Sequence, residues 1–212
     1  MTGKTHISIG LMSSAAVLSV NHSSTGGLLV GLALGTVGAL MPDIDTGKST
    51  ISYRIRQITT YGIVALLAVY VLMSNFSPQV EKINLFLKGI GVYKIFDRMP
   101  HNSEFLNTGL AILIVCIIFS KFTKHRSFTH SILGLFIFTL GFYLIVGNAA
   151  LYFAVGFVSH MLADTLTNSG IGVFYPIKTK IALKLVHTGS MIDHFIGGAA
   201  FVLFIVVMTK NL

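Results

Sequence analysis

Cysteine, tryptophan and charge are scarce in this chain of 212 residues. It has one cysteine, Cys116, so an internal disulfide framework is excluded. Tryptophan is absent, and charged residues make up 10% of the chain, against about 25% in a typical soluble domain. Hydrophobic residues make up 53%. This composition is typical of an integral membrane protein, and the length suits a single domain over residues 1–212.

Acidic residues are also few, and the formal net charge is +8. A basic protein can bind nucleic acid, but in a chain this apolar, basic loops that face anionic lipid are the better explanation. The sequence therefore predicts membrane lipids as partners and no nucleic acid. The first 20 residues have a weak basic region and no small-x-small exit site, so we expect a retained first helix rather than a cleaved signal.

Seven apolar runs predict an all-α fold, a polytopic helical bundle with about five to seven membrane-embedded helices. The runs cover residues 6–20, 26–41, 58–75, 106–120, 131–147, 149–166 and 191–209. The second run contains Gly27, Gly31 and Gly35, a spacing that lets helices approach closely. Residues 77–105 form the longest polar interval and include a candidate amphipathic helix at the membrane surface.

The placement of lysine and arginine predicts the orientation in the membrane. If the N-terminus is cytoplasmic, ten of the 15 basic residues fall on the cytoplasmic side and five on the other. That bias favours a multi-pass protein of the plasma or inner membrane with its N-terminus inside. The interval 77–105 weakens the bias, because it holds four of the five.

Most of the ionisable side chains collect at the predicted cytoplasmic ends of these runs. Four of the seven acidic residues and six of the eight histidines lie there. They are His6, Asp43, Asp45, His125, His130, His160, Asp164, His187, Asp193 and His194. Such residues are costly near hydrocarbon and usually mark a functional site.

The spacing of two pairs suits metal ligation. His160 and Asp164 are four residues apart, so on a helix they share one face and can grip one cation. Asp43 and Asp45 follow Pro42 and are two apart. In an extended backbone, which we expect here, both carboxylates would point the same way.

The stretch HRSFTHS, residues 125–131, contributes a third motif. His125 and His130 are five residues apart and do not share a helical face, so we expect one to lie before the helix, with Ser127 as its N-cap. The two rings can then approach an ion from different directions. Arg126 between them could clamp an anionic oxygen such as that of a phosphate.

Histidine and aspartate ligands suit Zn²⁺, Mn²⁺ or Fe²⁺. With no thiolate among the candidates, an open catalytic site with one or two divalent ions, Zn²⁺ first among them, is more natural than a closed structural site. Each motif alone has a common structural explanation, such as a solvated loop, a helix cap or an interfacial histidine. Their convergence at one membrane face favours metal binding. The predicted ligands are His6, Asp43, Asp45, His125, His130, His160 and Asp164.

Four of these stretches resemble the signatures of the YdjM-like, LexA-regulated membrane-bound metal-dependent hydrolases. They are MPDIDTGKS, HRSFTHS, HMLADTLTNSGIGVFYP and TGSMID. The resemblance covers nearly the whole chain and implies a helical membrane protein with a divalent-metal hydrolase site. It implies metal or catalytic roles for His6, Asp43, Asp45, His125, Arg126, His130, His160 and Asp164. The last motif usually ends in glutamate, where this chain has Asp193.

These features together predict a hydrolase that acts on the phosphoester of a lipid or lipid-linked molecule. The expected catalytic residues are His125, Arg126 and Asp193, with His125 or Asp193 as general base. Basic residues such as Lys178 could attract anionic head groups. The alternatives are a divalent-metal transporter and a non-catalytic metal-binding membrane protein. A transporter usually has mid-span ligands and an inverted repeat, whereas the motifs here lie at helix ends and no repeat is evident.

Overall fold

The computed structural model describes residues 1–20, 25–45 and 103–211, with a few isolated positions between 58 and 85. This part of the chain is helical, and the all-α prediction is confirmed. The α-helices are α1 (Gly3–Val20), α2 (Thr25–Leu40), α6 (Ser103–Phe122), α7 (Ile132–Val146), α8 (Ala150–Thr165) and α9 (Met191–Asn211). Short 3-10 helices follow or precede them: η1 (Met41–Asp45), η2 (Phe128–His130) and η3 (Gly147–Ala149). The expected run 58–75 and most of the interval 77–105 lie outside the described residues.

Four described segments are long and apolar enough to cross a membrane by length and composition. They are Gly27–Asp45, Glu104–Phe122, Ile132–Thr165 and Met191–Lys210. The third is a helical hairpin, because the chain turns back between α7 and α8, where Gly147 has a φ of 58°. With 15 and 16 residues, these helices are about 22–24 Å long, somewhat less than the roughly 30 Å hydrocarbon core.

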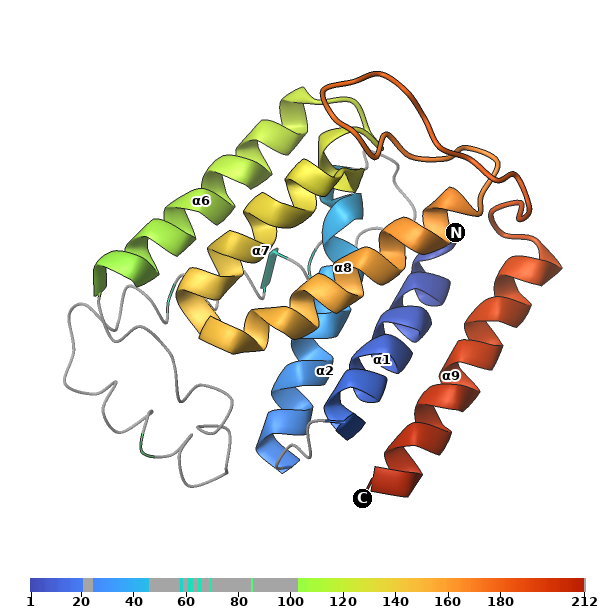
Figure 1. Ribbon diagram of the computed structural model, residues 1–212, viewed down its shortest axis with the longest axis horizontal. Coiled ribbons are helices and arrows are strands. Elements are labelled where there is room, and N and C mark those ends of the chain that lie inside the picture. Colours follow the sequence, from blue (N-terminus) through green and yellow to red (C-terminus); the bar gives the residue numbers. More distant parts are fainter. Residues whose placement is uncertain are drawn as a thin grey trace.

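Helix α8 lies at the centre of the bundle. It packs against α1, α2 and α7, while α9 packs on the outer side of α1 and α6 on α7 (Figure 1). Four buried phenylalanines fill the interface of the hairpin: Phe138, Phe142, Phe153 and Phe157. The rings of Phe142 and Phe153 are stacked with centroids 4.1 Å apart. This apolar core holds the hairpin as one unit.

The glycine spacing in α2 serves helix packing, as the sequence predicts. Gly31 lies against the side chain of Leu18 and Gly35 against that of Ser14, both on α1. These close approaches bring α1 and α2 together along their length.

On another side of α2, glycines put two backbones in direct contact. A Cβ atom at Gly156 of α8 would collide with the carbonyl of Gly35, and one at Gly38 of α2 would collide with the carbonyl of Phe153. No larger residue fits this crossing without moving a helix. The contact determines how the C-terminal ends of α2 and α8 are positioned relative to each other.

The polar ends of the helices meet at one end of the bundle. Helix α1 begins there beside the end of α8, and the segment after α8 runs across this end before α9 begins (Figure 1). Isolated bridges hold that segment, one between Thr167 and Val186 and one between Ile171 and Ile181. The candidate site lies in this region.

Candidate metal centre

Two histidine rings face each other at the centre of the site. Nδ1 of His160 lies 2.7 Å from the carbonyl oxygen of Ala39. Because a carbonyl can only accept, Nδ1 carries the proton, and the neutral ring presents a lone pair at Nε2. This pattern, in which a backbone carbonyl orients the ring, is common for metal-binding histidines.

His130 is oriented in the same way through a hydroxyl. The Thr129 hydroxyl donates to Oδ2 of Asp45 at 3.1 Å, so its oxygen accepts from Nδ1 of His130, also at 3.1 Å. The lone pair of neutral His130 is therefore at Nε2. The Nε2 atoms of His130 and His160 are 3.2 Å apart. Two lone pairs at that distance repel unless a cation or a proton lies between them.

Two carboxylates complete the set of acceptors. Oδ1 of Asp43 lies 3.6 Å from Nε2 of His130 and 3.9 Å from Nε2 of His160. Oδ2 of Asp164 lies 3.7 and 3.9 Å from the same two nitrogens. Ligand atoms about 2.0–2.1 Å from a tetrahedral ion are roughly 3.3–3.4 Å apart. The observed separations are close to that value.

Asp164 connects this set to its surroundings. Its Oδ1 lies 3.2 Å from Nε2 of His6 and also contacts the nitrogen of Met1. Its Oδ2 is 3.0 Å from Nη2 of Arg126 but has no hydrogen bond, although Asp164 is 1% exposed. The guanidinium of Arg126 therefore supplies a positive charge beside this buried carboxylate oxygen.

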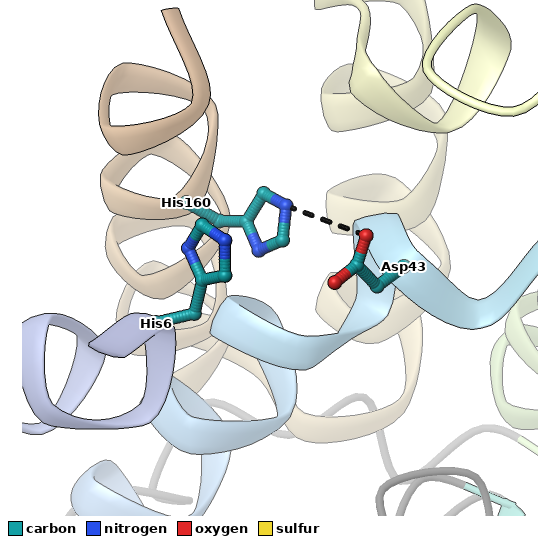
Figure 2. Close-up of side chains that lie close together, drawn as sticks. All are labelled: His6, Asp43 and His160. Carbon is teal, nitrogen blue, oxygen red and sulfur yellow. Dashed lines mark ion pairs between the residues drawn. The ribbon is translucent and has the colours of Figure 1, made fainter. Parts of the chain in front are cut away.

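His6 lies against the ring of His160. The two rings are stacked with centroids 3.7 Å apart, and Nε2 of His160 points toward Asp43 (Figure 2). The residue is 1% exposed, and within the described residues its Nδ1 has no hydrogen bond and its Nε2 contacts Oδ1 of Asp164 at 3.2 Å. His6 therefore offers one more buried nitrogen at the same site.

These residues fit a metal ion. Two overlapping groups have ligand atoms within 4.8 Å of one another: His6, Asp43 and His160, and His130, His160 and Asp164. Two carboxylates and three imidazole rings are suitable oxygen and nitrogen ligands for a divalent cation. The buried His–Asp cluster could hold a metal ion, with His160 common to both groups.

The carboxylates of Asp43 and Asp45 diverge, so the expectation that they point the same way is wrong. Residues Met41–Asp45 form a 3-10 helix that continues α2, not an extended strand. Successive side chains of a 3-10 helix are about 120° apart, so residues two apart face different directions. Asp43 faces the histidines, whereas Asp45 accepts from Thr129 and pairs with Nδ1 of His125 at 2.8 Å.

His125 and His130 do approach from different directions. Their ring centroids are 5.3 Å apart and the planes are nearly perpendicular. His125 and Asp45 are paired with each other and belong to neither metal-binding group in the described part of the chain. Their direct coordination of an ion stays a prediction.

The expected N-cap is wrong by four residues. Ser131 caps α7 by accepting a hydrogen bond from the backbone of Gly134 at 3.0 Å, whereas the hydroxyl of Ser127 donates to the carbonyl of Lys124. The residues between form η2. This extra turn buries His130 while leaving the side chain of His125 35% exposed.

Asp193 lies at the beginning of α9 and belongs to neither group. Its Oδ2 accepts from the backbone of Thr2 at 2.9 Å and from that of Gly189 at 2.7 Å. Its backbone carbonyl accepts from the hydroxyl of Thr5. Asp193 thus ties α9 to the start of α1, next to His6. His187 and His194 are exposed, and each contacts a nearby backbone carbonyl.

Two features of the site have no clear signal in the sequence. One is the carbonyl of Ala39, which orients His160 from a neighbouring helix. The other is the backbone of Arg126, which has a φ of 65°. The left-handed region costs a non-glycine residue on the order of 1–3 kcal/mol, and such strain is concentrated at functional sites. The strained turn directs the guanidinium toward Asp164.

Comparison with known proteins places the chain among membrane proteins. The family model described as YdjM inner membrane protein matches residues 1–211. The chain is 34% identical over 87 residues to the inner membrane protein YdjM of Escherichia coli (strain K12) and equally to that of Shigella flexneri. Each match covers 37% of this chain and 44% of the relative, so the matched region spans less than half of these relatives. No solved structure matches.

Proposed function

The chain belongs to the YdjM inner membrane protein family, and we propose that it is a membrane-bound, divalent-metal-dependent hydrolase that cleaves a phosphoester. The observation that carries the proposal is the pair of facing lone pairs on His130 and His160, flanked by Asp43 and Asp164. A divalent cation between the two nitrogens would remove their repulsion and balance the charge of the two carboxylates. Arg126 beside this arrangement supplies a positive charge that could bind the oxygen atoms of a phosphoester. A purely structural metal site has no need of such a group.

The metal would be held by His130, His160, Asp43 and Asp164, with His6 as a further nitrogen ligand. This oxygen-and-nitrogen set without thiolate suits Zn²⁺ first, with Mn²⁺ and Fe²⁺ as alternatives. A bound divalent ion polarises a phosphoryl oxygen and makes bound water acidic enough to act as a nucleophile near neutral pH.

Arg126 is placed to hold the phosphate. Its Nη2 is engaged with Asp164, but its buried Nε has no hydrogen-bond partner. An arginine fork can bind two oxygens of a phosphate at once. The free Nε–H gives Arg126 a donor for a substrate oxygen while Asp164 holds the other end of the guanidinium in place.

His125 is the best candidate to move a proton. Asp45 holds its Nδ1, which fixes the orientation of the ring and leaves Nε2 as the nitrogen that can exchange protons. The side chain is partly exposed, whereas His130 is fully buried. A histidine oriented by a carboxylate is a common general acid or base. We assign His125 this role in preference to Asp193, whose carboxylate joins two helix ends.

The position of the site supports a lipid substrate. The cluster is formed at the ends of α2 and α8, both within segments apolar enough to cross a membrane. A lipid or a lipid-linked molecule could present its phosphate there. The basic loop residue Lys178 is exposed on the same side and would attract anionic head groups.

The experiment is metal analysis of the purified protein followed by hydrolysis assays on phospholipids and isoprenyl phosphates. We expect turnover that stops with chelator and returns with Zn²⁺. His160→Ala should lose several orders of magnitude in rate, since each 1.36 kcal/mol of lost activation is about tenfold. Arg126→Lys, which keeps the charge but loses the fork, should cost about 10- to 100-fold.

The matched control is His194→Ala, because this histidine is exposed and lies outside both metal-binding groups. It should keep full activity and full metal content. Transport of metal across sealed vesicles that depends on His160, without cleavage of any phosphate offered, would instead support the transporter. Metal binding without hydrolysis or transport would support a non-catalytic protein with a structural metal.

A further inference from the structure

Two apolar grooves run along the sides of α7, beside the candidate site. The first, about 500 Å³, lies between α6 and α7 and is lined by Ala111, Val115, Phe119, Phe128, Leu133 and Tyr175 among others. The second, about 550 Å³, lies between α7 and α8 and is lined by Ile132, Phe136, Leu140, Tyr143, Leu151 and Ala154 among others. Apart from Thr108 in the first and Thr139 and Asn148 in the second, their linings are apolar or aromatic.

The two grooves begin at the same place. Leu133 in the first and Ile132 in the second are neighbours at the start of α7, immediately after η2, which carries His130. Phe128 lines the first groove near this end, and Phe119 and Tyr175 pack against its ring at 4.9 and 5.7 Å between centroids. Both grooves therefore lead away from the site along opposite sides of one helix.

The two grooves differ in length. In the first groove Thr108 and Phe119 are 11 positions apart on α6, which is about 16 Å at 1.5 Å per residue and roughly half of the 30 Å hydrocarbon core. The second groove runs along α7 from Ile132 to Asn148 in the turn before α8, and the 15 residues of α7 are about 22 Å long. The first ends near Gly109 and Gly141, where the backbones of α6 and α7 come into contact.

The end at the site is suited to an anion. Arg126 lies two residues before Phe128, and its buried Nε–H has no partner. Lys124 is exposed in the same turn. A molecule with a phosphate at Arg126 and hydrocarbon below it would thus meet a cationic group followed by apolar walls.

We propose that the two grooves bind the two acyl chains of one phospholipid, which straddles α7 with its phosphate at Arg126. This inference rests on the proposed function and names its substrate class. Two apolar grooves that start at neighbouring residues and follow opposite sides of one helix fit a lipid with two chains. A single long isoprenyl chain would fill one groove, leave the other empty and extend past the contact of Gly109 with Gly141.

The test blocks each groove separately. Ala111→Trp fills the first groove and Ala154→Trp the second, while Ala199→Trp on the exposed face of α9 is the matched control. Val115→Phe, a milder change at an exposed wall position, covers the case in which a tryptophan variant does not fold. The metal content of each purified variant is measured to check that its candidate metal centre is intact.

Binding is measured first without turnover. The chelated protein in nanodiscs is labelled with a diacyl phosphatidic acid that carries a diazirine in one acyl chain. We expect cross-links on the walls of the two grooves, lost from the blocked groove and unchanged in Ala199→Trp. Unlabelled diacyl phosphatidic acid should compete about tenfold or more better than a long-chain isoprenyl phosphate, since each buried methylene contributes to affinity.

Turnover is measured next, on long-chain phosphatidic acid and on its water-soluble dihexanoyl form. The blocked variants should lose about tenfold or more in kcat/KM for the long-chain lipid and keep the rate on the short one. Cross-links outside the grooves, equal loss in the α9 control or stronger competition by the isoprenyl phosphate would overturn the inference. If no phosphate is cleaved, the proposed function fails, and the cross-links still decide whether the grooves bind lipid.

Discussion

The hydroxyl of Thr129 is the link between two parts of the site. It donates to Asp45 and accepts from Nδ1 of His130, so it determines which nitrogen of His130 can bind an ion. Asp45 also holds His125. One carboxylate thus orients a metal ligand and the proposed proton-transfer residue together, although it belongs to neither metal-binding group.

Replacing Thr129 by valine tests this link, because valine has nearly the same shape without the hydroxyl. His130 would lose its fixed orientation, and metal affinity should fall about 10- to 100-fold, as is typical when a group that orients a ligand is removed. The measurement is competition with a chelator of known affinity. Thr209→Val, at the exposed end of α9, is the control. Equal affinity in both variants would show that Thr129 does not position His130.

The crossing of α2 and α8 depends on glycine. Gly38 and Gly156 allow the two backbones to touch, and the contact places the carbonyl of Ala39 against His160. The helix pair therefore positions a proposed metal ligand by its packing alone. A change at this crossing should affect both stability and metal affinity.

Gly156→Ala should destabilise the protein, because the added methyl group meets the backbone of α2 and cannot be accommodated by a side-chain rotation. Overpacking of this kind costs typically about 1–3 kcal/mol. Gly198→Ala in α9 is the matched control, since nothing lies within 4 Å of the position its Cβ would occupy. There alanine should be neutral or stabilise by up to about 1 kcal/mol. Unfolding in detergent by heat or denaturant compares the two, and equal stability would contradict the close crossing.

Within the described part of the chain, the histidines and aspartates of the cluster lie at one end of the bundle. The start of α1, the end of α8 and the segment before α9 lie together there (Figure 1), while the turn between α7 and α8 lies at the other end of the hairpin. The basic residues that follow α8, including Lys178 and Lys180, are exposed. Their excess over the basic residues of the opposite side favours a cytoplasmic location for the site.

Labelling of single cysteines decides this orientation. In a Cys116→Ser background, Lys178→Cys should resist an impermeant maleimide added outside intact cells, and Asn148→Cys in the exposed turn should react. Both should react after the cells are opened. Reaction of Lys178→Cys alone from outside would place the site on the outer face and reverse the orientation inferred from the lysines and arginines.

The amino-acid sequence alone predicts the helical character, most helix positions and the residues that form the cluster. Six expected runs coincide with α1, α2, α6, α7, α8 and α9 to within a few residues, because an apolar segment in lipid must satisfy its backbone hydrogen bonds internally and so forms a helix. His160 and Asp164 share a face as their spacing requires. This four-residue spacing can be read directly from the sequence, without knowledge of the fold.

The different positions of the candidate residues depend on contacts that form only in the folded chain. Asp43 and Asp45 have the same chemistry and are two residues apart, yet one faces the histidines and the other His125, because the chain continues α2 as a 3-10 helix instead of extending. The carbonyl that orients His160 comes from the distant residue Ala39, and the tautomer of His130 follows from a contact made by Asp45. Contacts between residues far apart in the chain depend on how the helices cross. The crossing of α2 and α8 depends on close packing at Gly38 and Gly156. The sequence shows these glycines but not which residues they pack against.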